Sequence, residues 1–283
     1  MVLKEDKNKI NSGLYIVSTP IGNLKDITLR ALDILKQCDL ILCEDTRVSK
    51  KLFSHYKIKN KIVSYHKFNE KKNVETIIKN LQKGEIVSLI SDAGTPTISD
   101  PGRILIERCV EENISVIPIP GASAITASLS ISAFSDQFYF HGFLPETDNM
   151  IRKSFKVFKS LECSIVFFIS AQKLIKKFQL LKEFFPDREI LICRELTKLH
   201  ESIYRGKISK INMSEFNPKG EVTVVISNLK KNDMTEHLNE SDKKKIKKLI
   251  KINSVKDIVR IISKEKNISK SKIYNYCLEI KNE

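Results

Sequence analysis

The loop SDAGTPTISDPG at residues 91–102 combines two carboxylates with hydroxyl groups and turn-forming residues, directly after the apolar run EIVSLI. Asp92 and Asp100 would repel a phosphate, so the loop does not predict a site for a nucleotide tail. The chain also lacks the patterns G-x-x-x-x-G-K-[ST] and G-x-G-x-x-G of phosphate-binding loops. Carboxylates and accessible backbone groups instead favour a ligand that carries positive charge and hydroxyls.

Two other loops share the glycine and proline content of this one. The segments TPIGN (19–23), AGTPTISDPG (93–102) and PIPG (118–121) hold nine of the 17 residues that are glycine or proline, from 9 Gly plus 8 Pro. Each follows a predicted strand and precedes a predicted helix, and open α/β sheets bind ligands beyond the carboxyl ends of their strands. Ordinary turn chemistry explains one such loop, but three in register indicate a shared site.

Strand and helix patterns alternate over the first 230 residues, which is typical of parallel α/β layers. In the helix pattern from residue 27, Ile27, Ala31, Ile34 and Leu35 share one face, and Asp26 is placed to cap it. Asp100 is similarly placed to cap a helix that starts at Pro101. The predicted strands cover residues 13–18, 39–44, 61–66, 85–90, 115–120, 137–143, 164–169, 188–194 and 221–227.

Three domains are expected. They are an N-terminal α/β domain over residues 12–124, a C-terminal α/β domain over 125–230 and a basic helical tail over 240–283, after a polar linker at 228–240. In the tail, apolar residues at spacings of three and four predict helices over 241–252, 254–266 and 269–280, which form a small bundle.

Composition and charge narrow the function classes. The chain of 283 residues is 41% hydrophobic and 29% charged, and it contains no apolar run of about 18 residues, so we expect a protein without a membrane span. The start MVLKEDKNKINS is too polar for a signal peptide, so we expect none there. Six scattered cysteines without C-x-x-C indicate reduced thiols in the cytoplasm, and neither they nor the five histidines predict a metal site.

The formal net charge of +15 favours a polyanionic partner such as nucleic acid, although a genome of biased composition, which enriches Lys, Ile and Asn, would also produce it. Residues 241–283 contain 13 Lys or Arg and 5 Asp or Glu, a net of +8 from 13 minus 5. More than half of the excess therefore lies in the last 43 residues, as a basic patch requires. Tyr274 and Tyr276 in this tail can stack on RNA, but helix packing explains at least one of them equally well.

An ordered series of motifs resembles a known family. The segments LYIVSTPIGNLKDITLRAL, LCEDTR, SDAGTPTISDPG, PIPGASA, GFLP, CRELTK and KGE are similar to the signature series of the ribosomal RNA small subunit methyltransferase I family, within the tetrapyrrole methylases. The resemblance covers about residues 12–230 and extends into the tail. It implies two α/β domains with S-adenosylmethionine in the cleft between them, and a homodimer. It also implies methyl transfer to the ribose 2′-oxygen of a decoding-centre cytidine in 16S rRNA.

The resemblance also implies the residues that bind the cofactor. Carried over motif by motif, they are Thr19, Pro20 and Gly22 on one side, Asp92, Ala93, Gly94 and Thr95 on another, and Pro120, Gly121 and Ser123 beyond. Capping of the following helix is the alternative role for Thr19 and Ser123. Glycine lets the backbone approach a ligand closely, and a carboxylate accepts charge-assisted hydrogen bonds from an ammonium group.

Two charged motifs provide candidates for the chemistry. CEDTR contains Asp45 and Arg47, and CRELTK contains Glu195 and Lys198. An acid or an unprotonated lysine can take the proton of the attacking hydroxyl, and an arginine can hold RNA phosphate. We expect Asp45 or Glu195 near the 2′-hydroxyl and Arg47 on phosphate, although an acid beside an arginine is often only an ion pair.

The chain departs from the family pattern at two positions. Ala122 stands where the family usually has a proline after the Pro-Gly pair, and Ile169 stands where it often has a glutamate. The second change puts in doubt any mechanism that needs a carboxylate there. The alternatives left open are a tetrapyrrole methyltransferase, which does not need a basic tail, and a non-catalytic ribosome-assembly factor that binds RNA. A nicotinamide-dependent oxidoreductase is disfavoured because the glycine fingerprint is missing.

Overall fold

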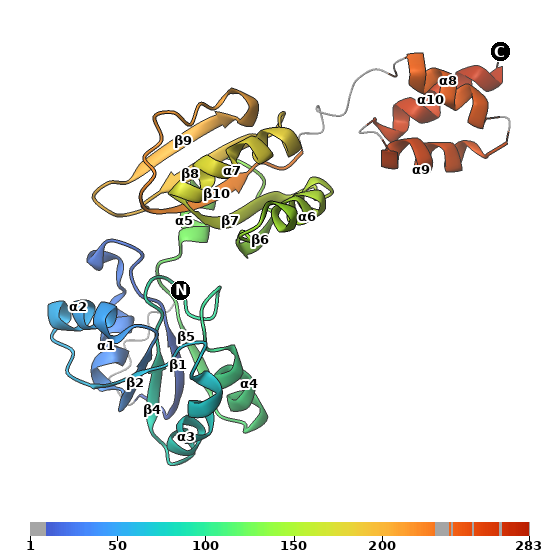
Figure 1. Ribbon diagram of the computed structural model, residues 1–283. Helices are drawn as coiled ribbons and strands as arrows, with labels where there is room; N and C mark the ends of the chain where they lie inside the picture. The colour runs from blue at the N-terminus through green and yellow to red at the C-terminus, as the bar shows by residue number, and fades with distance from the viewer. Residues whose placement is uncertain (1–9, 230–237, 239, 251, 266–267, 283) are drawn as a thin grey trace, which may run out of the picture. The chain divides into compact units, whose positions relative to one another are not determined.

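The computed structural model describes residues 10–229, 238, 240–250, 252–265 and 268–282 (Figure 1). Its contacts divide the chain into two compact units, one made of Met1–Lys159 with Ser164–Ser227 and one made of Ser160–Cys163 with Asn228–Glu283. The first unit contains both β-sheets and the second contains the helical tail. Most of the linker predicted at 228–240 lies outside the described residues, and the division of the first unit into two domains stays a prediction.

The first sheet is entirely parallel, with the order β3-β2-β4-β1-β5. Its strands are β1 (Gly13–Val17), β2 (Leu40–Cys43), β3 (Lys61–Ser64), β4 (Ile86–Leu89) and β5 (Val116–Ile119). The helices between them are α1 (Leu29–Gln37), α2 (Thr46–Tyr56), α3 (Glu70–Gln82) and α4 (Arg103–Glu111).

Apolar side chains cover both faces of this sheet, as a parallel sheet requires. Alternate residues of β1 point to opposite sides, so Leu14 packs in the cluster with α3 and α4 while Tyr15 packs in the cluster with α1 and α2. All the strands predicted for this half are confirmed.

The three loops rich in glycine and proline meet at the carboxyl edge of this sheet. They follow β1, β4 and β5, which are neighbours in the strand order. Thr19 and Gly94 exchange a pair of backbone hydrogen bonds of 2.9 and 3.0 Å, and the hydroxyls of Ser18 and Thr95 lie 3.1 Å apart. The expectation that these loops share one edge is confirmed.

The second sheet differs from the predicted parallel pattern. Its order is β6-β7-β10-β8-β9, and only β6 and β7 are parallel. The strands are β6 (Phe138–Phe143), β7 (Ser164–Ser170), β8 (Glu189–Arg194), β9 (Ser202–Lys207) and β10 (Glu221–Ile226). The helices of this half are α5 (Ala124–Ser130), α6 (Asp148–Lys159) and α7 (Ala171–Phe184).

The parallel prediction fails here because the later connections contain no crossover helix. A parallel pair needs a long connection, whereas β8 and β9 are joined by the short loop 195–201 and therefore run antiparallel. The strand β10 then inserts between β7 and β8, antiparallel to both. The strand β9 was not among those predicted.

Two predicted helix caps are wrong. Helix α1 begins at Leu29, and the side chain of Thr28 accepts its capping hydrogen bond from the Ala31 N–H, while Asp26 ends the short 3-10 helix Leu24–Asp26. Helix α4 begins at Arg103, after Gly102, so Asp100 does not cap it. Gly102 has a φ of 125°, which no helix accommodates, and the helix therefore starts only after it.

The second unit contains the helices α8 (Glu240–Leu249), α9 (Val255–Glu265) and α10 (Lys270–Asn282). Its core is formed by Ile246, Ile258, Ile262, Ile268, Ile273 and Cys277, which confirms the predicted bundle. Tyr276 packs against this core, whereas Tyr274 is 48% exposed. Within the described part of the chain, every helix is too short or too polar to cross a bilayer.

Candidate functional site

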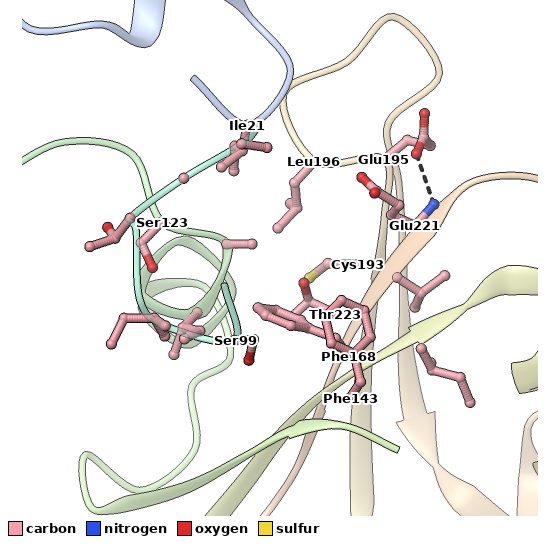
Figure 2. Close-up of a pocket in the computed structure, with 18 of the residues that line it drawn as sticks. Ile21, Ser99, Ser123, Phe143, Phe168, Cys193, Glu195, Leu196, Glu221 and Thr223 are labelled. Atoms are coloured by element: carbon pink, nitrogen blue, oxygen red, sulfur yellow. Dashed lines mark hydrogen bonds between the residues drawn. The ribbon is translucent and has the colours of Figure 1, made fainter. Parts of the chain in front are cut away.

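A cavity of about 410 Å³ lies in the first unit, where the loops of the first sheet face residues of the second. Its size falls in the range of small-molecule sites, about 300–1,000 Å³. The polar residues that line it are Asp92, Thr95, Ser99, Asp100, Ser123, Ser170, Glu195, Lys198, Glu221 and Thr223. Figure 2 shows Ile21, Ser99 and Ser123 on one side and Phe143, Phe168 and Glu221 on the other.

The loop after β4 presents backbone to this cavity. Gly94 has a φ of 83°, which favours glycine, and a Cβ at this position would lie 3.3 Å from Ile21 Cγ2. The Thr19 hydroxyl donates to the carbonyl of Ser91 at 3.1 Å. It therefore stabilises this loop and does not cap a helix. Ser123 stands at the first position before α5 without a side-chain capping bond, which leaves its hydroxyl available to the cavity.

The second sheet provides an aromatic wall. Phe143 of β6 and Phe168 of β7 contact each other with ring centroids 5.3 Å apart, and both line the cavity (Figure 2). Ile125 from α5 adds apolar surface. A planar aromatic ligand packs well against rings arranged in this way.

Charged side chains form a bonded network at the end of β8. Lys198 Nζ donates to Glu195 Oε1 and to Glu221 Oε2, both at 2.9 Å, and the Glu221 N–H donates to Glu195 Oε1 at 2.9 Å. Burial acts to raise the pKa of Glu195, but the Glu221 N–H and the Lys198 ammonium outweigh it and lower that pKa. Burial acts to lower the pKa of Lys198, but the two glutamates outweigh it and raise that pKa. Lys198 is therefore a cation near neutral pH and a poor proton acceptor.

Three carboxylates, those of Glu44, Asp92 and Asp100, lie in loops at the carboxyl edge of the first sheet. Burial, followed by the charges of the neighbouring Glu44 and Asp92, raises the pKa of Asp100 to about 6. Burial, followed by the charge of Asp92, also raises the pKa of Glu44. Asp92 has a raised pKa from burial, although it accepts a hydrogen bond from the Asp45 N–H at 3.1 Å. Asp92 and Asp100 line the cavity, so their ionic state is sensitive to a cationic ligand there.

Asp45 and Arg47 lie at the start of α2. Asp45 caps this helix by accepting from the Arg47 N–H at 2.8 Å, and it pairs with the Arg47 guanidinium at 2.6 Å. Hydrogen bonds from Arg47 lower the pKa of Asp45 to about 2. A carboxylate with so low a pKa is a weak proton acceptor. The Arg47 side chain is 88% exposed and accessible to a large ligand.

The cavity brings together seven of the predicted residues, namely Asp92, Ala93, Gly94, Thr95, Ser123, Glu195 and Lys198. The others, Thr19, Pro20, Gly22, Pro120, Gly121, Asp45 and Arg47, are not among its lining residues. Gly22 and Gly121 allow close packing of the chain, and their part in cofactor binding stays a prediction. A Cβ on Gly22 would lie 2.8 Å from the carbonyl of Leu196, and one on Gly121 would lie 2.8 Å from Ser18 Cβ.

Sequence reasoning missed much of the cavity wall. The lining residues that it did not place there include Ser99, Asp100, Phe143, Phe168 and Thr223. Asp100 belongs to the quoted loop and was interpreted as a helix cap, while the phenylalanines look like ordinary core residues of a strand. Within the described residues, no group of three or more His, Cys, Asp and Glu side chains is placed to hold a metal ion.

Comparison with known proteins decides the family. The family model for tetrapyrrole (corrin/porphyrin) methylases matches residues 13–212. A protein of Mesomycoplasma conjunctivae named ribosomal RNA small subunit methyltransferase I is 45% identical over 215 residues, which cover 75% of this chain and 90% of that protein. The chain belongs to the ribosomal RNA small subunit methyltransferase I family of tetrapyrrole methylases. The resemblance carried by the motifs and the predicted fold class are both confirmed.

Other members of this methyltransferase family extend the match to the tail. The protein of the same name from Buchnera aphidicola is 38% identical over 273 residues, which cover 94% of this chain and 96% of the relative. A crystal structure of diphthine synthase matches with a TM-score of 0.61 at 14% identity, over 76% of this chain and 89% of that one. At that identity the likeness concerns the fold alone.

Proposed function

We propose that the chain transfers a methyl group from S-adenosylmethionine to the ribose 2′-hydroxyl of a decoding-centre cytidine in the 16S rRNA of the small ribosomal subunit. The observation that carries the proposal is the carboxylate-lined cavity, present in a chain whose relatives are named as small-subunit rRNA methyltransferases. The net charge of +8 over residues 241–283 supports a polyanionic substrate.

The cavity fits the chemistry of this methyl donor. It contains the carboxylates of Asp92, Asp100, Glu195 and Glu221 and the ammonium of Lys198, so its charge is predominantly negative. The donor carries an ammonium and a sulfonium, ribose hydroxyls and no phosphate, and when bound it supplies an electrophilic methyl group. Hydroxyls at Thr95, Ser99 and Ser123 offer partners for the ribose, and the Phe143–Phe168 wall suits a purine ring.

Among the acids of this region, Asp100 is best suited to accept the proton of the attacking hydroxyl. A general base works best when its pKa lies near the operating pH. Asp45 has a pKa of about 2, and that of Glu195 is lowered by its bonded partners, whereas that of Asp100 is raised to about 6. Asp100 also lines the cavity. We therefore assign Asp100 this role in place of Asp45 or Glu195.

The Asp100 assignment is tested by single-turnover methylation with Asp100→Asn at several pH values. Wild-type rates should rise with pH through the pKa of Asp100, and Asp100→Asn should be slower by about 10²-fold or more without this rise. An unchanged pH profile in Asp100→Asn would remove Asp100 from the mechanism.

Cations beyond the cavity would hold the RNA. Arg47 is exposed at the same sheet edge, and its guanidinium, which pairs with Asp45, would also contact phosphate. The tail would add affinity without contacting the donor. We further propose that the enzyme acts in the cytoplasm and forms a homodimer. Sedimentation equilibrium of the purified chain tests the homodimer directly.

The reaction itself is tested with methyl-labelled S-adenosylmethionine and small subunits from cells that lack this protein. After alkaline hydrolysis, a 2′-O-methyl group blocks cleavage at its own nucleotide, so label in an alkali-resistant dinucleotide is the expected result. Label in mononucleotides would mean base methylation and would overturn the assigned acceptor atom. Absence of label, together with intact donor binding, would favour a small tetrapyrrole substrate.

A further inference from the structure

Phe68 is 95% exposed although it lies on a well-bonded turn between β3 and α3. The Asn69 side chain accepts from the His66 N–H at 2.8 Å and donates to the Ser64 carbonyl at 3.0 Å. The Phe68 N–H donates to His66 Nδ1 at 3.3 Å, and the two rings are in edge contact. The turn is therefore held in one conformation that presents the Phe68 ring to its surroundings.

This turn lies at the same sheet edge as the cavity. The Tyr65 N–H donates to the Cys43 carbonyl at 2.8 Å, which places the turn beside the β2 loop that carries Asp45 and Arg47. On its other side, Glu70 Oε2 accepts from the Gly102 N–H at 3.3 Å, at the end of the loop that lines the cavity. A polymer whose reacting unit occupies the cavity has to continue over the surface around it, and this edge is part of that surface.

The segments on either side of the exposed ring are rich in cations. Residues 66–72 contain Lys67, Lys71 and Lys72 against Glu70, a net of +2 from 3 minus 1. Helix α2, which begins in the β2 loop beside this turn, contains Arg47, Lys50 and Lys51 and no acid. An isolated exposed apolar residue is unremarkable in a protein surface. A rigid aromatic ring among cations is instead the pattern of single-stranded nucleic-acid sites, where bases stack on rings and cations follow the backbone.

We propose that Phe68 is a stacking platform for an unpaired RNA base next to the target nucleotide, with Lys67 and Arg47 on the adjoining phosphates. The inference rests on the proposed function, since it assigns part of the substrate to a surface outside the cavity. Phe68 does not line the cavity, so the affinity for the methyl donor should not depend on it.

The stacking is tested in Phe68→Trp, because the chain has no tryptophan and the new indole is a unique reporter. Its fluorescence should be quenched when single-stranded RNA that spans the target site is added to the full-length protein. Val110 on α4 is 65% exposed, so Val110→Trp is the matched control, in which no quenching is expected. Equal quenching in both variants, or none in Phe68→Trp, would overturn the proposal.

Kinetics provide a second readout. Phe68→Ala should raise the KM for small subunits by about fivefold or more, which corresponds to the loss of one base stack, and should leave donor binding unchanged. Phe68→Trp should restore the KM and Phe68→Leu should not, because stacking needs a ring. An unchanged KM in Phe68→Ala, with wild-type methylation intact, would overturn this inference alone. Inactivity of the wild type on subunits would instead count against the proposed function.

A competing occupant of this surface is a second copy of the chain. Sedimentation of Phe68→Ala distinguishes the two, because an RNA platform leaves the oligomeric state of the protein unchanged. Dissociation of an oligomer in Phe68→Ala would assign Phe68 to an interface between copies and overturn the proposal.

Discussion

Glu195 occupies the space that a side chain at position 220 would need. A Cβ on Gly220 would lie 2.6 Å from Glu195 Cγ and 2.8 Å from its Oε1. Both residues have positive φ, 52° for Glu195 and 104° for Gly220, and the N–H of Glu221 donates to Glu195 Oε1 at 2.9 Å. The strained backbone at Glu195 therefore persists because its carboxylate fits against a glycine.

Gly220→Ala should displace the Glu195 side chain and distort this end of the cavity. We expect lower stability and weaker binding of S-adenosylmethionine. Gly84→Ala is the control, since Gly84 has a φ of 89° but no atom within 4 Å of the added Cβ, so it isolates backbone strain, about 1–2 kcal/mol. Denaturant unfolding and calorimetric titration measure the two effects. Equal losses in both variants would show that the contact with Glu195 has no role.

Asp100 should make stability depend on pH in the acid range. Its pKa is raised from 3.8 to about 6 by burial and by Glu44 and Asp92, so between these pH values the folded state binds more protons than the unfolded state. The contribution of Asp100 to the free energy of unfolding is therefore largest below pH 3.8, and it is lost as the pH rises through about 6. Asp100→Asn should unfold at a higher temperature than wild type at pH 7.5, and the difference should shrink at pH 5. A constant difference would contradict the raised pKa.

Asp45→Asn should retain more than about a tenth of the methylation rate, because asparagine also caps helices and the proposed proton acceptor is Asp100. Loss of a general base typically costs about 10²- to 10⁴-fold. Asp45→Ala removes the bond from the Arg47 N–H as well and should lower the unfolding temperature more than Asp45→Asn does. Stopped assays on small subunits and thermal unfolding provide both numbers. A rate below a hundredth of wild type in a folded Asp45→Asn would restore Asp45 as the base.

Periodicity and loop composition predict the first sheet well, because each of its strands is followed by a helix and apolar side chains cover both faces of the sheet. They fail for β9, whose segment SIYRGK pairs only with β8 and carries polar residues and Gly206. An edge strand of this kind lacks the apolar run by which the other strands are recognised. Pairing direction in the second sheet depends on which strand β10 joins, which is a long-range choice.

The residues of the cavity likewise divide into those that local sequence predicts and those that depend on long-range pairing. Asp92, Gly94 and Thr95 are recognisable because one loop contains them, whereas Phe143 and Phe168 become wall residues only through the pairing of β6 with β7. Asp45 and Lys198 illustrate the other limit. Their residue types suit proton transfer. For Asp45 the neighbouring Arg47 in CEDTR already offers an ion pair as the alternative. For Lys198 one of the two glutamates that raise its pKa, Glu221, meets it only in the fold.

The exposed lysines of α8 should provide part of the affinity for the small subunit. A variant with Lys244, Lys247 and Lys248 all changed to Gln keeps the buried residues of the bundle, such as Ile246. We expect weaker binding to subunits and a shallower dependence of log K on log salt, by up to about 2 to 3 units for three lost phosphate contacts. Donor binding should stay unchanged.

The control for this variant removes the same charge elsewhere. Lys36, Lys79 and Lys83 lie exposed near the carboxyl ends of α1 and α3, at the sheet edge opposite to the three loops, and changing them to Gln should leave the salt slope unaltered. Filter binding at several salt concentrations compares the two variants at equal net charge. A similar loss of slope in both would mean that only total charge matters, and the tail would then have no specific part in binding. A slope reduced in the α8 variant alone would assign RNA contacts to that helix, because charge is matched and only its position differs.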